Sequence, residues 1–163
     1  MAVLATLAVG SPPVVLRRAV AADLPELVAL LAADQLGATR DGIRTDSDLE
    51  AYQAAFNAID ADPAHLLVVA QAGEDIVGTL QLSFLPGLAR RGALRAQIEA
   101  VRVSASSRSR GLGAAMMTWA ITESRRRGCG LVQLTTDKAR PDAHRLYERL
   151  GFTASHEGMK LRL

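Results

Sequence analysis

The hydrophobic positions of the chain follow two different spacings. Four segments repeat apolar residues every three to four positions, as amphipathic helices do: 23–37, 47–62, 111–127 and 141–150. Six segments carry short apolar runs or alternating apolar positions, as strands do: 14–18, 66–70, 76–84, 96–103, 131–135 and 152–163. The order of these elements predicts an α/β fold with a mixed sheet, antiparallel early in the chain and parallel around the third helix.

The length of 163 residues leaves room for one domain. Residues 1–13 form an apolar run that Pro12 and Pro13 close, and no Lys or Arg precedes it as a signal peptide would require. We expect a loose N-terminal extension over 1–13 and a single domain over 14–163. A lone cysteine, three scattered histidines and the lack of any segment of membrane length predict a cytoplasmic protein without disulfides, metal or membrane contact.

The net charge of +2 hides an uneven distribution of charge along the chain. Residues 1–80 hold 4 basic and 11 acidic side chains, a net charge of −7, whereas residues 81–163 hold 15 basic and 6 acidic ones, a net charge of +9. This asymmetry suggests two different partners, one anionic and one cationic. Aromatic residues make up only 4% of the chain and show no stacking pattern beside the arginines, so a nucleic-acid partner is not expected.

The segment 101–115, VRVSASSRSRGLGAA, runs from a predicted strand through a Ser, Arg and Gly loop into a predicted helix. Its Gly-x-Gly sequence lets a ligand approach the backbone, and the free N–H groups at the helix start favour an anion. Arg108 and Arg110 add positive charges suited to phosphate oxygens. No Lys follows as in a Walker loop, and Met116 stands where a dinucleotide-binding fingerprint needs a small residue. We therefore favour a pyrophosphate site over a helix start with merely solvated arginines.

Two motifs resemble those of the GNAT superfamily of N-acetyltransferases. The sequence over 108–114 is similar to the superfamily's Arg/Gln-x-x-Gly-x-Gly/Ala loop, and the sequence over 140–152 is similar to its second motif, which ends in Tyr-x-x-x-Gly-Phe. Their order and spacing agree with the superfamily over about residues 14–163. The resemblance implies a mostly antiparallel sheet of six to seven strands flanked by about four helices, with acetyl-CoA as cofactor.

The resemblance also implies a cofactor-binding surface. Backbone amides of the loop would hold the pyrophosphate, and the preceding strand would hold the pantetheine arm beside a splay that a bulge often helps to open. The cofactor-binding residues predicted in this way are Val101, Arg102, Val103, Arg108, Ser109, Arg110, Gly111, Leu112, Gly113 and Ala114. One position departs from the pattern, because Arg140 stands where many members have an Asn that contacts the arm.

Two residues are candidates for the chemistry. Tyr147 matches the superfamily tyrosine placed near the CoA sulfur and would protonate the leaving thiolate, the alternative being a core aromatic. Glu99 lies on the strand that would carry the thioester and would act as the base, often through water. Its alternative role is a structural carboxylate paired with an arginine such as Arg102.

The predicted acceptor is the primary amine of a basic small molecule or of a peptide rather than an acidic substrate, since the region between the first two helices usually shapes the acceptor entrance in this fold. Five acidic residues lie in or beside this region and would attract a cationic amine: Asp34, Asp41, Asp46, Asp48 and Glu50. The function predicted from these features is direct transfer of an acetyl group from acetyl-CoA to the amine in a ternary complex. The alternative is a CoA-binding sensor or interaction module without catalysis, and a homodimer is a common assembly in the superfamily.

Overall fold

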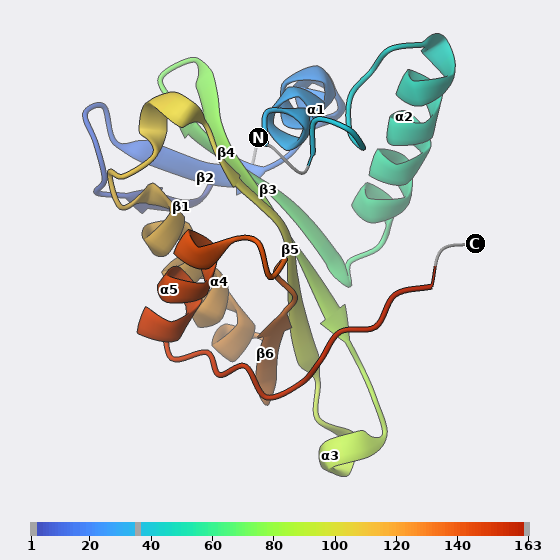
Figure 1. The fold of residues 1–163 in the computed structure, drawn as a ribbon, viewed down its shortest axis with the longest axis vertical. Coiled ribbons are helices and arrows are strands. Elements are labelled where there is room, and N and C mark those ends of the chain that lie inside the picture. Colours follow the sequence, from blue (N-terminus) through green and yellow to red (C-terminus); the bar gives the residue numbers. More distant parts are fainter. Residues whose placement is uncertain (1–2, 35–36, 162–163) are drawn as a thin grey trace.

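The computed structural model describes residues 3–34 and 37–161, which contain one six-stranded sheet with its strands in chain order (Figure 1). The strands are β1 (Val3–Leu7), β2 (Val14–Arg18), β3 (His65–Ala72), β4 (Asp75–Leu85), β5 (Arg95–Val103) and β6 (Leu131–Leu134). Neighbouring strands from β1 to β5 are antiparallel, and β5 and β6 are parallel. The predicted mixed, mostly antiparallel sheet is confirmed.

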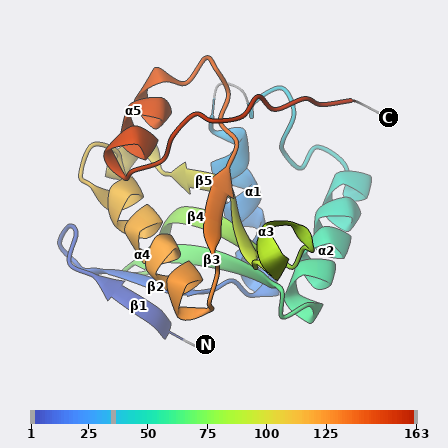
Figure 2. The ribbon, with the colours of Figure 1, turned by 90° about the horizontal axis from the view of Figure 1, so that it is seen from below.

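Helices cover both faces of this sheet (Figure 2). The helices are α1 (Leu24–Ala32), α2 (Asp46–Ala61), α3 (Ala89–Gly92), α4 (Leu112–Arg126) and α5 (Pro141–Arg149), with short 3₁₀ segments η1 (Ala21–Asp23) and η2 (Ala105–Ser107). Helices α1 and α2 lie on one face and α4 and α5 on the other, while α3 is a single turn at the tip of the β4–β5 hairpin. The four long helices agree with the predicted ones. Within residues 3–34 and 37–161, no helix is both long and apolar enough to cross a membrane.

Two apolar clusters hold the helices to the sheet. The larger lies under α4 and includes Leu82, Ile98 and Met116, each at most 2% exposed. The smaller lies under α1 and α2 and includes Val28 and Phe56. Burial of one such side chain contributes roughly 1.5–3 kcal/mol, so the two clusters fix the central strands β3 and β4 from both sides.

The expected loose extension over 1–13 is wrong for residues 3–7, which form strand β1 at the edge of the sheet. Strand β1 pairs antiparallel with β2, with Leu7 opposite Val14. Leu4, Leu7 and Val9 pack against the larger apolar cluster. The apolar residues of this N-terminal segment thus cover the edge of β2 and part of the core.

The strand expected over 152–163 is also absent from the described residues of that segment, 152–161. Its alternating apolar residues face solvent, with Met159 94% and Leu161 86% exposed. Alternation makes a strand possible, but a strand also needs a neighbour that pairs with its backbone. The described sheet therefore ends at β6.

Candidate active site

Strand β5 carries a bulge in its pairing with β4. Ala100 and Val101 together face the single residue Leu80, and Ala100 has a φ of +53°. Because side chains alternate along a strand, the extra residue exchanges the two faces beyond this point. Val101 consequently packs against the larger apolar cluster, whereas the side chain of Arg102 reaches the opposite face, towards the end of α1.

The predicted splay between β5 and the next strand is present. Strand β6 pairs with β5 only along Arg95–Ile98, and the last five residues of β5 have no β6 partner among the described residues. Two carbonyl oxygens of this free stretch accept bonds from arginines, Val101 O from Arg102 Nη1 at 2.9 Å and Val103 O from Arg108 Nε at 3.2 Å. The free edge offers backbone donors and acceptors to an extended polar ligand.

The loop before α4 presents consecutive unpaired amides. The N–H groups of Ser109 to Ala114 have no hydrogen-bond acceptor in the part of the chain that the structure describes, and Ala115 N–H is the first to bond back, to Gly111 O at 3.0 Å. Ser109 and Gly111 take positive φ values of +61° and +80°, which turn the chain into the helix. Six such donors at the start of a 15-residue helix have the chemistry that favours an anion.

The neighbours of Gly113 leave room for a side chain at this position, so the packing of the chain does not require a glycine there. A Cβ atom at Gly113 would lie 3.7 Å from Val103 Cγ2 and 3.9 Å from Leu146 Cδ2, which is ordinary van der Waals contact. Gly113 therefore leaves open a space, between the end of β5 and α5, that an alanine could fill without strain. The space suits a ligand that runs close to the backbone.

Tyr147 lies on α5, packed against the larger apolar cluster and in edge contact with Phe152, with ring centroids 5.9 Å apart. Its hydroxyl has no hydrogen-bond partner among the described residues. Burial raises the pKa of the Tyr147 phenol, and the positive charges of Arg140 and Arg102 partly oppose this effect. The phenol is therefore protonated at neutral pH and carries a proton that it can donate.

Glu99 precedes the bulge and is exposed. It pairs through the backbone with Gln81, a residue that lines a cavity under α1 and α2. Among the described residues it forms no ion pair, and Arg102 lies against Asp34 instead. The structural pairing of Glu99 with Arg102, considered as an alternative, is therefore not formed, and the carboxylate is open to solvent on the side of that cavity.

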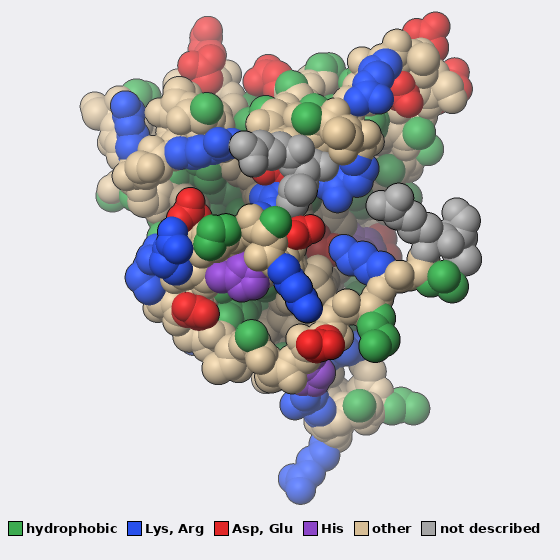
Figure 3. All heavy atoms as spheres, viewed as in Figure 1, with side chains coloured by type: hydrophobic (Ala, Val, Ile, Leu, Met, Phe, Trp, Pro, Cys, Tyr) green, Lys and Arg blue, Asp and Glu red, His purple; other side chains and the backbone are tan. Residues whose placement is uncertain are grey.

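Acidic and basic side chains are intermixed on the face shown in Figure 3 rather than divided into two patches. Three of the five acidic residues around the α1–α2 connection form ion pairs or hydrogen bonds with other residues of the chain. Asp41 pairs with Arg40 at 3.0 Å. Asp48 accepts a hydrogen bond from Arg44 N–H and forms the capping box of α2 with Thr45, and these bonds, that from Arg44 most, lower the Asp48 pKa. Asp34 is the third, and like Asp41 it is paired with arginine, so arginines balance two of the five carboxylates expected at the acceptor mouth.

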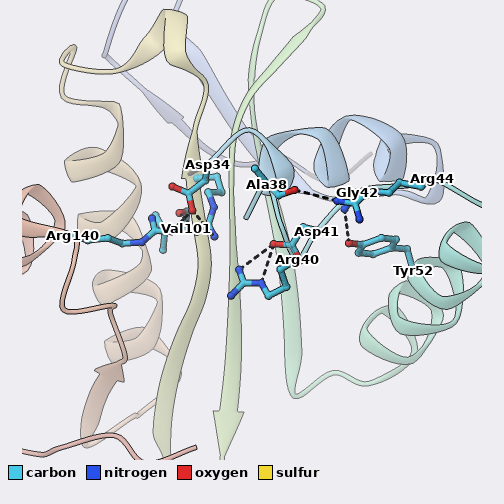
Figure 4. Close-up of polar contacts among 10 residues, drawn as sticks. Asp34, Ala38, Arg40, Asp41, Gly42, Arg44, Tyr52, Val101 and Arg140 are labelled. Atoms are coloured by element: carbon cyan, nitrogen blue, oxygen red, sulfur yellow. Dashed lines mark hydrogen bonds and ion pairs between the residues drawn. The ribbon is translucent and has the colours of Figure 1, made fainter. Parts of the chain in front are cut away.

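Asp34 lies beyond the end of α1 and faces Arg140 from a distant part of the chain (Figure 4), and Arg102 of β5 approaches it as well. Arg140 Nη2 is hydrogen-bonded to Asp34 Oδ2, and Arg102 Nη2 lies 3.7 Å from the same oxygen. Arg102 Nε is buried and has no hydrogen-bond partner within residues 3–34 and 37–161. Burial, followed by the charge of Arg140, lowers the pKa of Arg102. The cluster thus holds two guanidinium groups and one carboxylate.

A cavity of about 100 Å³ lies between α1, α2 and the sheet. Its walls are mainly apolar and include Leu27, Phe56 and the bulge residue Ala100. The bulge therefore joins three features: the free edge of β5, this cavity and the arginine cluster. An acceptor in or beside the cavity would approach β5 from the face opposite α4.

The motifs located the loop, Tyr147 and the strand, but they gave no indication that Asp34 meets Arg102 and Arg140. These residues lie more than thirty positions apart, and their contact depends on the bulge at Ala100 and on the start of α5. The one signal in the sequence was Arg102 itself, because an arginine within the largely apolar sequence of β5 needs an anionic or hydrogen-bonding partner.

A splayed parallel strand pair, a bulged strand and a helix start with free amides define a fold and site suited to acyl transfer from a CoA thioester. The model of the acetyltransferase (GNAT) family matches residues 29–152, and the chain belongs to this family. It is an acyltransferase, and its family uses acetyl-CoA.

Three relatives illustrate the similarity. An aminoalkylphosphonate N-acetyltransferase of Salmonella typhimurium LT2 is 30% identical over 70% of this chain and 73% of its own. The solved structure of a transcriptional regulator from Bacillus halodurans C-125 is 46% identical, with a TM-score of 0.87 over 92% of this chain and 99% of its own. That of an acetyltransferase from Trypanosoma brucei is 28% identical, with a TM-score of 0.73 over 92% and 99%.

Proposed function

We propose that the protein transfers the acetyl group of acetyl-CoA directly to the primary amine of a small acceptor, in a ternary complex. The observation that carries this proposal is the run of six unpaired amides, Ser109 to Ala114, at the end of the splayed strand β5. The amides would bind the pyrophosphate, and the free edge at Val101 and Val103 would bind the pantetheine arm. This arrangement would bring the thioester to the bulge.

Two groups would handle the protons of the reaction. An alkylammonium with a pKa near 10.4 is only about one part in a thousand free amine at pH 7, so a proton must leave before attack. The exposed carboxylate of Glu99 would accept it, directly or through water. The neutral amine would attack the thioester carbonyl, and Tyr147 would protonate the departing thiolate, a role that the raised pKa of its phenol supports.

Support for an amine acceptor comes from the Salmonella relative, whose name describes an N-acetyltransferase acting on aminoalkylphosphonates. Asp46 and Glu50, both exposed at the start of α2, remain as the acidic groups that would attract the ammonium of the acceptor. The Bacillus relative, described as a transcriptional regulator, favours testing the alternative of a CoA-binding sensor in the same experiment.

The test is a thiol-release assay with acetyl-CoA and a panel of small primary amines, applied to the wild type and to Tyr147→Phe. Phe keeps the ring contact with Phe152 and removes only the phenol, so kcat should fall about 100-fold or more while the KM for acetyl-CoA stays within about twofold. Unchanged kcat would remove Tyr147 from the mechanism. CoA binding without turnover of any amine by the wild type would favour the sensor.

A further inference from the structure

We propose that Arg102 and Arg140 form a subsite for an anionic group of the acceptor, so that the substrate is a small primary amine also bearing a phosphonate, phosphate or carboxylate. The inference rests on the proposed function and specifies its substrate class. It assigns the specificity for that class to two side chains outside the pyrophosphate loop.

The first argument is the imbalance of charge in the cluster. Two guanidinium groups approach the same oxygen of Asp34, and only the bond from Arg140 is a hydrogen bond, because 3.7 Å is too long for one from Arg102. One carboxylate opposite two guanidiniums leaves one positive charge in excess. Such a site attracts a further anion.

The second argument is the unused hydrogen-bonding capacity of Arg102. A guanidinium has five N–H donors. Here Nη1 donates to Val101 O, while Nε is buried without a partner in the described chain. The Arg102 side chain is only 14% exposed, and a buried, incompletely paired cation is costly. An oxyanion with several oxygens would satisfy these donors and offset that cost.

The third argument is the position of the cluster. Arg102 follows the bulge residue Ala100, which lines the apolar cavity, and Arg140 is the N-cap residue of α5, the helix that carries Tyr147. The charges of both arginines act on the Tyr147 phenol. An acceptor anchored here by its anion would therefore place its amine near the proposed chemistry.

The cluster is also separate from the pyrophosphate loop. The loop adjoins the face of β5 that bears Val103, since Gly113 approaches Val103 Cγ2 there. Arg102 lies on the other face because of the bulge, next to the end of α1. In the free protein Asp34 occupies the place of the acceptor's anion, and the acceptor would displace it from the arginines.

The kinetic test compares 2-aminoethylphosphonate, β-alanine and uncharged propylamine as acceptors. We expect Arg102→Gln and Arg140→Gln each to raise the KM for the two anionic amines by about 10-fold or more beyond any change in the KM for propylamine measured with the same variant. Asp34→Asn should lower the KM for the anionic amines, because it removes the competing carboxylate. The matched control is Arg125→Gln, an exposed arginine in the last turn of α4, which should change none of these values.

A binding test needs no turnover. Isothermal titration calorimetry with methylphosphonate, in saturating CoA so that the loop is filled, should show binding to the wild type and to Arg125→Gln, and loss in Arg102→Gln. Binding of methylphosphonate without acetylation of any amine would overturn the proposed function and retain the subsite.

Two results would overturn the subsite itself. One is acetylation of propylamine with no methylphosphonate binding and no change of acceptor KM in either arginine variant. The other is a rise in the KM for acetyl-CoA as large as that for the acceptor, which would assign the arginines to the cofactor. Far-ultraviolet circular dichroism of both variants shows whether each is folded. Arg140 is more exposed than Arg102, so Arg140→Gln still tests the subsite if Arg102→Gln fails to fold.

Discussion

Two arginines of this protein, the buried Arg17 and the partly buried Arg102, meet an aspartate in very different ways. Arg17 binds Asp23 through two hydrogen bonds of 2.7 and 2.8 Å, and its Nε donates to Gln71 at 2.7 Å. Arg102 Nη2 lies 3.7 Å from Asp34 Oδ2, Arg140 binds the same oxygen, and Arg102 Nε has no hydrogen-bond partner among the residues that the structure describes. The pKa of Arg17 is raised by the hydrogen bonds that it donates to Asp23, whereas the pKa of Arg102 is lowered by burial.

The difference separates a structural pair from a site prepared for a ligand. Arg17 and Asp23 are both less than 10% exposed and use their polar atoms on each other and on nearby groups, which holds the start of α1 against β2. A saturated pair of this kind has no capacity left for a ligand. The unsaturated arginine lies next to the proposed catalytic groups, where an additional anion would complete its bonding.

The largest effect in this comparison is expected from Arg17→Met. It leaves the Asp23 carboxylate buried without its cation, which should lower the free energy of unfolding by about 3–5 kcal/mol. Urea denaturation followed by circular dichroism measures this change. A loss below about 1 kcal/mol would show that the saturated pair is not structural, and the contrast with Arg102 would fail.

The same pair predicts how stability depends on pH. Burial alone would raise the pKa of Asp23, but the hydrogen bonds from Arg17 and from Val20 N–H lower it below its ordinary value. A carboxyl whose pKa is depressed by folding stabilises the protein above its unfolded pKa of about 3.9, and this contribution is lost as the pH falls through the folded pKa.

Denaturation curves from about pH 6 to about pH 3 should therefore show falling stability of the wild type in the acidic part of the range. In Arg17→Met the unpaired, buried Asp23 protonates more readily, so the stability difference between the two proteins should narrow as the pH falls. A difference that stays constant over the range would remove Asp23 from the acid response.

The smallest effect on stability is expected from Arg102→Met. Asp34 keeps its hydrogen bond to Arg140, and the incompletely paired Arg102 no longer has to be buried, so the free energy of unfolding should change by less than about 1 kcal/mol. The substitution type matches Arg17→Met, which makes the two denaturation curves directly comparable. A loss as large as that of Arg17→Met would make Arg102 a structural residue.

Much of the fold followed from local patterns. Helical and strand spacing predicted the four long helices and five of the strands, because burial of one face imposes a period on the sequence. The two terminal segments were interpreted wrongly. Residues 3–7 pair with β2, whereas residues 152–161 find no backbone partner in the described sheet, and apolar composition does not distinguish these outcomes.

The sequence by itself determined the family and the loop of free amides, because the glycines, arginines and helix start that form this loop are neighbours in the chain. Only the tertiary structure decided which way Arg102 points, because one extra residue at Ala100 exchanges the faces of β5. It also decided that Asp34 from the end of α1 and Arg140 from the start of α5 meet there. Backbone sites arise from consecutive residues, whereas a site made of side chains from three distant elements exists only once the sheet has set their register.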